Sequence, residues 1–145
     1  MQSPILAPIV ALAAWTMVMW VWMYATRLPA MARAGIDGTK MIGTTGRGLR
    51  DQLVAAGEER ASWVADNYNH LLEQPVVFYA VALVLAMTGT GGGLNAGLAW
   101  AYVALRIAHS LVQATRNIVM IRFSLFALAS LTLMALTVHA GLALH

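Results

Sequence analysis

The sequence predicts an all-α integral membrane protein, a bundle of four transmembrane helices. Of its 145 residues, 60% are hydrophobic and 10% are charged, whereas soluble domains have about 25% charged residues. All Lys, Arg, Asp and Glu residues lie in two blocks, from Arg27 to Glu73 and from Arg106 to Arg122. Charge confined to two blocks between apolar runs is typical of a membrane protein whose loops face one compartment. This distribution argues against a nucleic-acid partner, although the net charge is +3, and the lack of cysteine excludes disulfides and thiolate catalysis by the chain itself.

The first span is predicted at residues 4–26, a run without a charged residue. At about 1.5 Å per residue, a helix of this length crosses a hydrocarbon core of about 30 Å. A cleaved signal peptide is the alternative, but such a peptide has a basic segment before a shorter apolar core. The second half of the run is rich in aromatic residues, as at a membrane–water interface. These residues are Trp15, Trp20, Trp22 and Tyr24.

Three more spans are predicted, at about 70–88, 94–115 and 123–144. The second must include Glu73, because the uncharged residues between it and the glycine tract are too few to cross the hydrocarbon core. The third must include Arg106. In lipid a segment must satisfy its own backbone polar groups, so each span is predicted to be a helix.

The connector 27–62 carries most of the basic residues. The excess of Lys and Arg on one side predicts that this side is cytoplasmic and that both termini are non-cytoplasmic. The connector is rich in glycine but lacks the spacing of a nucleotide-binding loop. It is therefore predicted to be a cytoplasmic loop whose bases touch anionic lipid headgroups. The whole chain, 1–145, is predicted to form a single membrane domain.

Polar residues form a stripe along the third span. Its members follow steps of three and four, as on one helix face. They are Arg106, His109, Gln113, Arg116 and Asn117. A similar stripe on the second span contains Asp66, either Asn69 or His70, and Glu73. The two spans run in opposite directions, so the stripes lie at the same depth. An ion pair between Arg106 and Glu73 is therefore predicted, because a lone charge in the membrane is costly.

Two interpretations of these stripes are open. Either they line a cleft for an anionic or zwitterionic ligand, or Glu73 and Arg106 only hold helices together. A metal site at His70, Glu73 and His109 is chemically reasonable, but no metal is expected, because the sequence does not fix the geometry between helices. His139, alone in an apolar span, is expected to be a structural histidine.

Two segments resemble the MAPEG family, the membrane-associated proteins of eicosanoid and glutathione metabolism. They are ADNYNHLLEQPVVFYA at 65–80 and LRIAHSLVQATRNIVMIRF at 105–123. The resemblance is to bacterial members, and it implies a MAPEG-like bundle that assembles as a homotrimer in the bacterial inner membrane, in contact with lipids. It also implies glutathione as the cofactor, bound between adjacent subunits at the cytoplasmic side.

The resemblance further implies roles for individual residues. Glu73 matches the acid of a motif on the second helix, and Arg106 with His109 matches an Arg-x-x-His pair on the third. Arg122 matches an arginine that stabilises a thiolate, and it is the implied catalytic residue. The other implied ligand-binding residues are His70, Gln113 and Arg116.

Three positions depart from the family pattern. Asp66 stands where the motif has arginine, and His70 stands where it has asparagine. Gln113 stands where eukaryotic members have tyrosine. The change at Asp66 reverses the charge where a glutathione carboxylate would be held.

The function implied by the resemblance is that of a membrane glutathione transferase or peroxidase. Its lipophilic small-molecule substrate would be an electrophile or a lipid hydroperoxide that reaches the cleft from the lipid. The alternative is a non-catalytic membrane protein of the same fold that binds lipid or assembles with a larger complex. A small transporter is a third class, disfavoured because no internal repeat is evident.

Overall fold

The computed structural model describes residues 3–145, which form helices and no strands. The helices of this range are α1 (Leu6–Arg33), α2 (Gly46–Ala55), α3 (Glu59–Leu71), α4 (Gln74–Met87), α5 (Gly93–Thr115) and α6 (Val119–Leu142). The predicted all-α fold class is thus confirmed.

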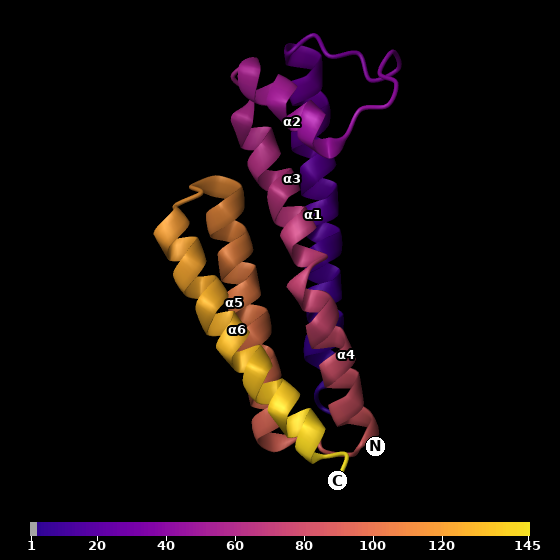
Figure 1. Cartoon of the computed structure of the whole chain (residues 1–145), viewed down its shortest axis with the longest axis vertical. Helices are drawn as coiled ribbons and strands as arrows, with labels where there is room; N and C mark the ends of the chain where they lie inside the picture. The colour runs from indigo at the N-terminus through magenta and orange to yellow at the C-terminus, as the bar shows by residue number, and fades with distance from the viewer. Residues whose placement is uncertain (1–2) are drawn as a thin grey trace.

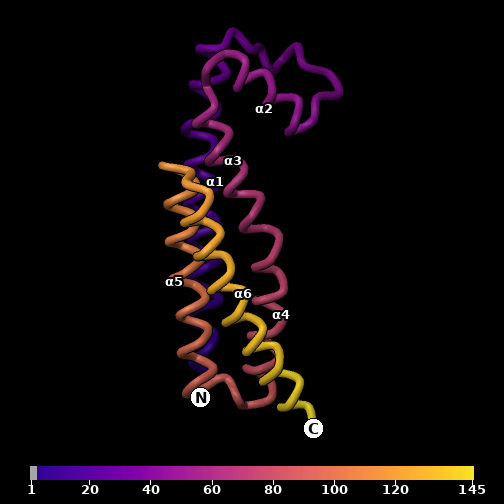
Figure 2. Tube along the Cα trace, turned by 60° about the vertical axis from the view of Figure 1, so that its left-hand side comes forward, coloured from indigo at the N-terminus to yellow at the C-terminus, as the bar shows by residue number. Residues whose placement is uncertain are grey.

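The helices form one elongated bundle. α1 runs along most of the molecule, and α3 and α4 follow one another along its side (Figure 1). α5 packs against α1, α3 and α6, so it holds a central position, whereas α6 rests on α5 and α4. Figure 2 shows α5 and α6 side by side, with the end of α6 far from α2. The start of α1 and the end of α6 therefore lie at one end, and the basic connector lies at the other (Figure 1).

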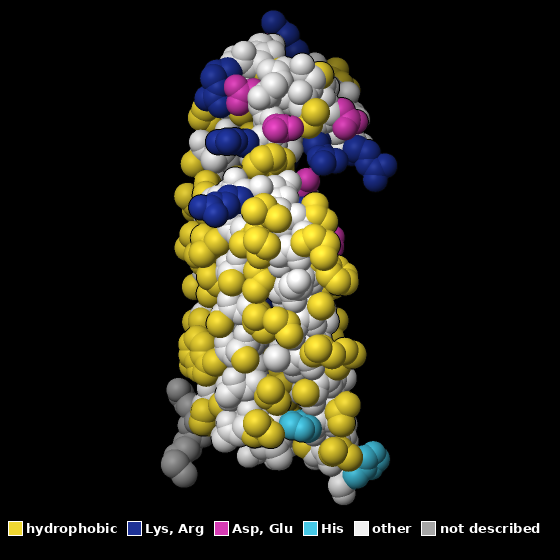
Figure 3. All heavy atoms as spheres, turned by 90° about the vertical axis from the view of Figure 1, so that its left-hand side faces the viewer, with side chains coloured by type: hydrophobic (Ala, Val, Ile, Leu, Met, Phe, Trp, Pro, Cys, Tyr) yellow, Lys and Arg dark blue, Asp and Glu magenta, His cyan; other side chains and the backbone are white. Residues whose placement is uncertain are grey.

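Three helical stretches of the described residues are long and apolar enough to cross a membrane. They are Leu6–Arg33, Glu59–Met87 and Val119–Leu142. The remaining predicted span coincides with α5, which has 23 residues but is less apolar because it carries the polar stripe. On the face drawn in Figure 3, charged side chains gather toward the connector end and apolar side chains cover most of the rest.

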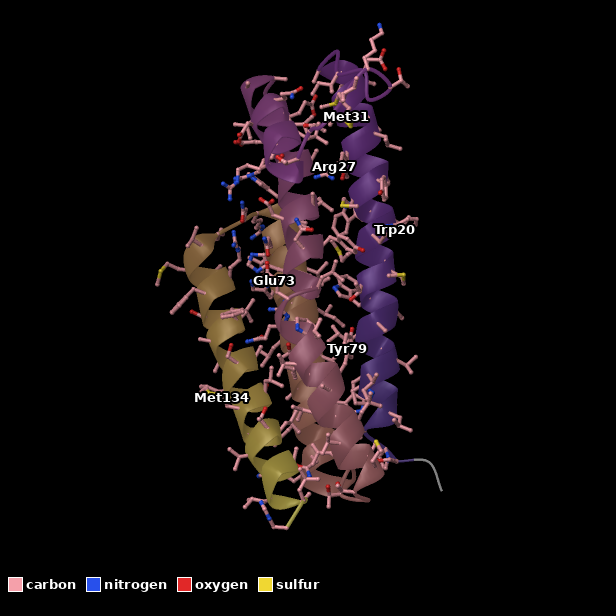
Figure 4. All side chains as sticks on the ribbon, turned by 45° about the vertical axis from the view of Figure 1, so that its right-hand side comes forward. Trp20, Arg27, Met31, Glu73, Tyr79 and Met134 are labelled. Carbon is pink, nitrogen blue, oxygen red and sulfur yellow. The ribbon has the colours of Figure 1, made fainter. Side chains whose placement is uncertain are left out.

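The second predicted span is broken in its middle. α3 ends at Leu71 and α4 begins at Gln74, because Pro75 lacks an amide hydrogen and fits only the first turn of a helix. Glu73, at the N-cap of α4, has a non-helical backbone with φ −91° and ψ −95°. It lies at this junction, about halfway along the bundle (Figure 4).

The connector 27–62 contains less loop than predicted. α1 continues to Arg33, because the residues after the apolar run are mostly good helix formers such as alanine and methionine. α2 is a second helix within the connector. Its N-cap is Thr45, whose hydroxyl oxygen accepts a hydrogen bond from the amide of Gly48 at 3.1 Å, which satisfies one of the free amides at a helix start.

A small core holds α2 against the end of α1. Leu53 is fully buried and packs with Ala30 and Ala61, separately from the main core of the bundle. The Arg33 guanidinium donates two hydrogen bonds to the Glu58 carboxylate, at 2.6 and 2.7 Å. The connector is therefore a folded cap on one end of the bundle.

The opposite end is closed by the glycine tract before α5. The amide of Ile5 donates to the carbonyl oxygen of Gly91 at 3.0 Å. A Cβ on Gly91 would lie 2.3 Å from the Ser3 hydroxyl and 2.6 Å from the Ile5 side chain, so only glycine allows this approach. Nearby, His139 Nδ1 lies 2.6 Å from the side-chain oxygen of Asn95. The expectation that His139 is structural agrees with this contact between α6 and α5.

Candidate functional site

The polar stripe of α5 is buried inside the bundle. Arg106 is 1% exposed, and His109 and Gln113 are each 2% exposed. Ser110, on the same side of the helix, is fully buried. Arg116 follows the last residue of α5 and is exposed, so the stripe runs from the interior to the surface at the α5–α6 turn.

Arg106 holds the broken end of α3. Its Nη2 atom donates a hydrogen bond to the carbonyl oxygen of His70 at 2.7 Å. That carbonyl lies in the last turn of α3, where carbonyls have no partner within the helix and the helix dipole favours a positive charge. The guanidinium carbon also lies 5.9 Å from the centre of the Phe126 ring on α6. Arg106 thus joins three helices at the level of the kink.

The predicted ion pair between Arg106 and Glu73 is wrong. Neither residue takes part in a salt bridge among residues 3–145, and Glu73 is exposed while Arg106 is buried. The prediction assumed one continuous helix through Glu73. The break at Pro75 gives Glu73 a non-helical backbone, so its side chain leaves the stripe, and the freed carbonyl of His70 becomes the partner of Arg106 instead.

His70 is the residue of the α3 stripe that meets α5. Its ring stacks on the ring of His109, with centroids 6.0 Å apart and planes at 29°. His109 also lies near Phe126, at 6.4 Å between ring centroids. Within the described part of the chain, no three His, Asp or Glu side chains come close enough to hold a metal ion. The alternative metal site at His70, Glu73 and His109 therefore has no geometric support.

Asp66 and Asn69 lie on another side of α3. They line a cavity bounded by α1 and α2, and a carboxylate oxygen of Asp66 lies 3.4 Å from Nε of Arg50. The continuous stripe predicted on the second span is therefore divided, because only its His70 faces α5. The charge reversal at Asp66 is offset locally by an arginine of the connector.

Arg122 lies in the first turn of α6 and is oriented by the turn before it. Its Nη1 atom donates a short hydrogen bond to the side-chain oxygen of Asn117. Asn117 has a φ of +52°, a left-handed conformation that asparagine tolerates better than most residues. The sequence analysis did not assign this role to Asn117, although a polar residue between two helices is a recognisable turn signal.

A second series of polar contacts, next to the stripe on the side of the α5 N-terminus, was not predicted from the sequence. The Tyr102 hydroxyl donates to Oε1 of Gln74 at 3.3 Å, and Nε2 of Gln74 donates to the Ser130 hydroxyl at 2.8 Å. Tyr102 is buried and stacks on Phe78 with ring centroids 4.6 Å apart. Its position four residues before Arg106 continues the stripe, which is the signal that would have identified it.

The stripe retains unused hydrogen-bonding capacity. The buried atoms without a partner among the described residues include Nε and Nη1 of Arg106, Nδ1 of His109, Oε1 of Gln113, and Nε of Arg122. A buried polar group without a partner costs about 1–3 kcal/mol. Neither arginine forms a salt bridge in the described range. The arrangement is therefore a buried, positively charged region that can accept an anionic ligand.

Comparison with known proteins places the chain in a family. The model of the MAPEG family matches residues 5–142, nearly the whole chain. The chain belongs to the MAPEG family. No curated protein matches it, and no solved structure matches it.

Membership explains the layout described above. A MAPEG protein is an integral membrane protein of the glutathione and eicosanoid metabolism family, in agreement with the apolar stretches Leu6–Arg33, Glu59–Met87 and Val119–Leu142. Both segments that resemble the family, 65–80 and 105–123, lie within the matched region. They bring His70, Arg106, His109 and the start of α6 together.

Proposed function

We propose that this MAPEG protein binds glutathione beside the α5 stripe and acts as a membrane transferase or peroxidase on lipophilic electrophiles or lipid hydroperoxides. The observation that carries the proposal is the pair of arginines, Arg106 and Arg122, whose Nε atoms are buried without a partner among the described residues. The proposal includes assembly as a homotrimer in a bacterial inner membrane, with both termini non-cytoplasmic. The common end shared by the start of α1 and the end of α6 supports that orientation.

The residues present fit the chemistry of glutathione. Its carboxylates need cationic groups or hydrogen-bond donors, which Arg106, His109 and the exposed Arg116 supply. Its ammonium group needs an acceptor, which the exposed carboxylate of Glu73 supplies. Gln113 and His70 add polar contacts on the same side of the bundle.

Arg122 is the proposed catalytic residue. Glutathione, when bound, supplies the thiol nucleophile. Asn117 fixes the direction of the Arg122 guanidinium, and a cation beside a thiol lowers its pKa and raises the fraction of reactive thiolate. The exposed apolar surface of α6 and α1 would give a lipophilic second substrate access from the lipid.

The test is the thermal stability of the detergent-purified protein with and without millimolar glutathione. A ligand at 100 times its dissociation constant stabilises the folded state by about 2.7 kcal/mol. The Arg122→Gln variant should lose part of the stabilisation, and Arg60→Gln, which changes an exposed arginine of α3, should keep it. Turnover of an aromatic electrophile or a lipid hydroperoxide would then separate the transferase from the peroxidase.

A second function is favoured by the contacts of Arg106. Its hydrogen bond to the His70 carbonyl and its position near Phe126 give it a role in holding helices together. A non-catalytic member of the family that binds lipid or a larger complex would need only this role. Wild-type protein that shows no stabilisation by glutathione but is stabilised by added lipid would favour this alternative.

A further inference from the structure

A recess lies at the connector end of the bundle, between α1, the start of α3 and the end of α5. It has a volume of about 610 Å³. α1 and α3 extend beyond α5 at this end (Figure 1), so the end of α5 forms the floor of the recess. It shares no lining residue with the cavity that contains Asp66 and Asn69, and none of its residues belongs to the proposed glutathione site.

Two helices present carbonyl groups without a partner to this recess. Pro29 lies inside α1 and has no amide hydrogen, so the carbonyl of Ala25 lacks the donor that a regular helix would provide. Both residues line the recess, as do Ala114 and Thr115 in the last turn of α5. The backbone amides that follow α5 bond to Val112, which leaves the carbonyls of Ala114 and Thr115 without a backbone partner among residues 3–145. Helix C-termini favour positive charge, but the last turn of α5 contains no basic residue.

The rim of the recess carries charges of both signs. Arg33 and Glu58 form an ion pair at 2.6 Å and line the rim together with Arg60. Arg60 is exposed and takes no part in a salt bridge among the described residues. The recess therefore combines carbonyl acceptors on its floor and wall with one uncompensated cation at its rim. A ligand with a cationic donor and an anionic group matches this arrangement.

The recess lies at the depth of lipid headgroups. Trp22 lines it, and Trp20 and Tyr24 on the same stretch of α1 form an edge-to-face pair with centroids 5.1 Å apart. Tryptophan and tyrosine concentrate where a membrane meets water. An apolar groove of α1 shares Ala25 and Pro29 with the recess and continues along Trp20 toward the hydrocarbon region. An acyl chain in this groove would place its headgroup in the recess.

We propose that this recess binds the headgroup of a phospholipid that carries a primary ammonium group. The ammonium donates hydrogen bonds to the free carbonyls of Ala25 and of the end of α5, and Arg60 pairs with the phosphate. A quaternary ammonium has no hydrogen to donate and is held by several aromatic rings, whereas one ring, that of Trp22, lines the recess in the described part of the chain. The site shares no residue with the proposed glutathione site, so the two proposals fail separately.

The experiment measures lipid retention by native mass spectrometry of the full chain in detergent. The purified protein is offered phosphatidylethanolamine or phosphatidylcholine with the same acyl chains. Both lipids are zwitterions with a phosphate diester, but only phosphatidylethanolamine has hydrogens on its nitrogen. We expect the wild type to retain phosphatidylethanolamine about tenfold better, which is the effect of one hydrogen bond from a charged group.

The variant Pro29→Ala separates binding from folding. Alanine restores the amide donor to the Ala25 carbonyl, so it removes an acceptor from the recess while it makes α1 more regular. The preference for phosphatidylethanolamine should fall several-fold, and thermal stability should stay the same or rise. Arg60→Gln removes the phosphate contact that both lipids share, so it should weaken the retention of each about threefold and leave their ratio unchanged. Arg47→Gln, which changes an exposed arginine outside the recess, is the matched control and should alter neither.

Equal retention of the two lipids by the wild type would overturn the proposal. Stronger retention of phosphatidylglycerol, which has no nitrogen, would overturn it as well, because it would show a basic surface without selectivity for an ammonium group. A lipid preference that survives Pro29→Ala, or retention that is indifferent to Arg60→Gln, would contradict the assigned contacts. A wild type that retains no lipid would show that another part of the assembly covers the recess, and this result too would overturn the proposal.

Discussion

Polar residues are held in different ways in the bundle and at its connector end. In the bundle, Arg106 is buried and its hydrogen bond goes to a backbone carbonyl. At the connector end, Arg33 and Glu58 form an exposed pair of opposite charges. The contrast teaches that the helix break, rather than a carboxylate, creates the partner of the buried cation. Removal of the buried contact should therefore lower the stability of the protein more than removal of the exposed pair.

The largest effect is expected from the buried cation. Arg106→Met removes the donor to the His70 carbonyl at the end of α3, and we expect a loss of about 3 kcal/mol in the free energy of unfolding. Glu73→Gln, at an exposed position, should change this free energy by no more than about 0.5 kcal/mol. Chemical denaturation of the detergent-purified variants measures both. The two effects should add in the double variant. Strong coupling between them would instead indicate an ion pair between Arg106 and Glu73, and it would contradict the structure.

The next effect tests how tightly the opposite end of the bundle is packed. Gly91→Ala places a methyl group against Ser3 and Ile5, and forced overpacking costs about 1–3 kcal/mol. The matched control is Gly97→Ala, on a part of α5 where an added Cβ meets nothing within 4 Å. It should raise stability by about 0.5–1 kcal/mol, because alanine is the better helix former. Equal effects of the two changes on thermal unfolding would disprove the close approach.

A smaller effect is expected at the start of α2. Thr45→Ala removes the hydroxyl that caps the Gly48 amide, which typically costs about 1 kcal/mol. The loss should be local, so amide hydrogen exchange should accelerate in α2 and remain unchanged in α5. Thr39→Ala is the control, because Thr39 bonds only within the exposed turn at Asp37. Exchange that accelerates across the whole bundle would show that the connector is not a separate cap.

The smallest effect is a dependence on pH at the connector end. Hydrogen bonds from the Arg33 guanidinium lower the pKa of Glu58, so the stabilisation is complete above the ordinary glutamate pKa of about 4.3. It is lost as the pH falls below that value and through the lower pKa of the folded state. Wild type should therefore exceed Glu58→Gln in thermal stability at neutral pH but not in acid. A constant difference between them at both pH values would contradict this assignment.

The main features of the fold follow from local sequence. The period of apolar residues and the separation of charges predict membrane helices. Steps of three and four also predict that Arg106, His109 and Gln113 share one face, which the structure shows to be buried. These predictions succeed because each depends on residues within a few helical turns.

The remaining features depend on contacts that local pattern does not contain. The partner of Arg106 is a backbone carbonyl, and no residue type marks a free carbonyl. The pairing of Asp66 with Arg50 requires α2 to fold back on α3, across a connector whose loops carry no periodic signal. The orientation of Arg122 depends on the positive φ of Asn117. Each is a consequence of tertiary packing rather than of spacing along one helix.

The most direct measurement is the pKa of the thiol of bound glutathione, followed by thiolate absorbance in wild type, Arg122→Gln and the control Arg60→Gln. A free thiol of this type has a pKa of about 8.5. We expect the bound thiol to titrate at least one unit lower in the wild type and in the control, and to return toward the ordinary value in Arg122→Gln. A bound thiol with the ordinary pKa in the wild type would contradict the proposed role of the buried cations. A lowered pKa that stays the same in Arg122→Gln would also contradict it.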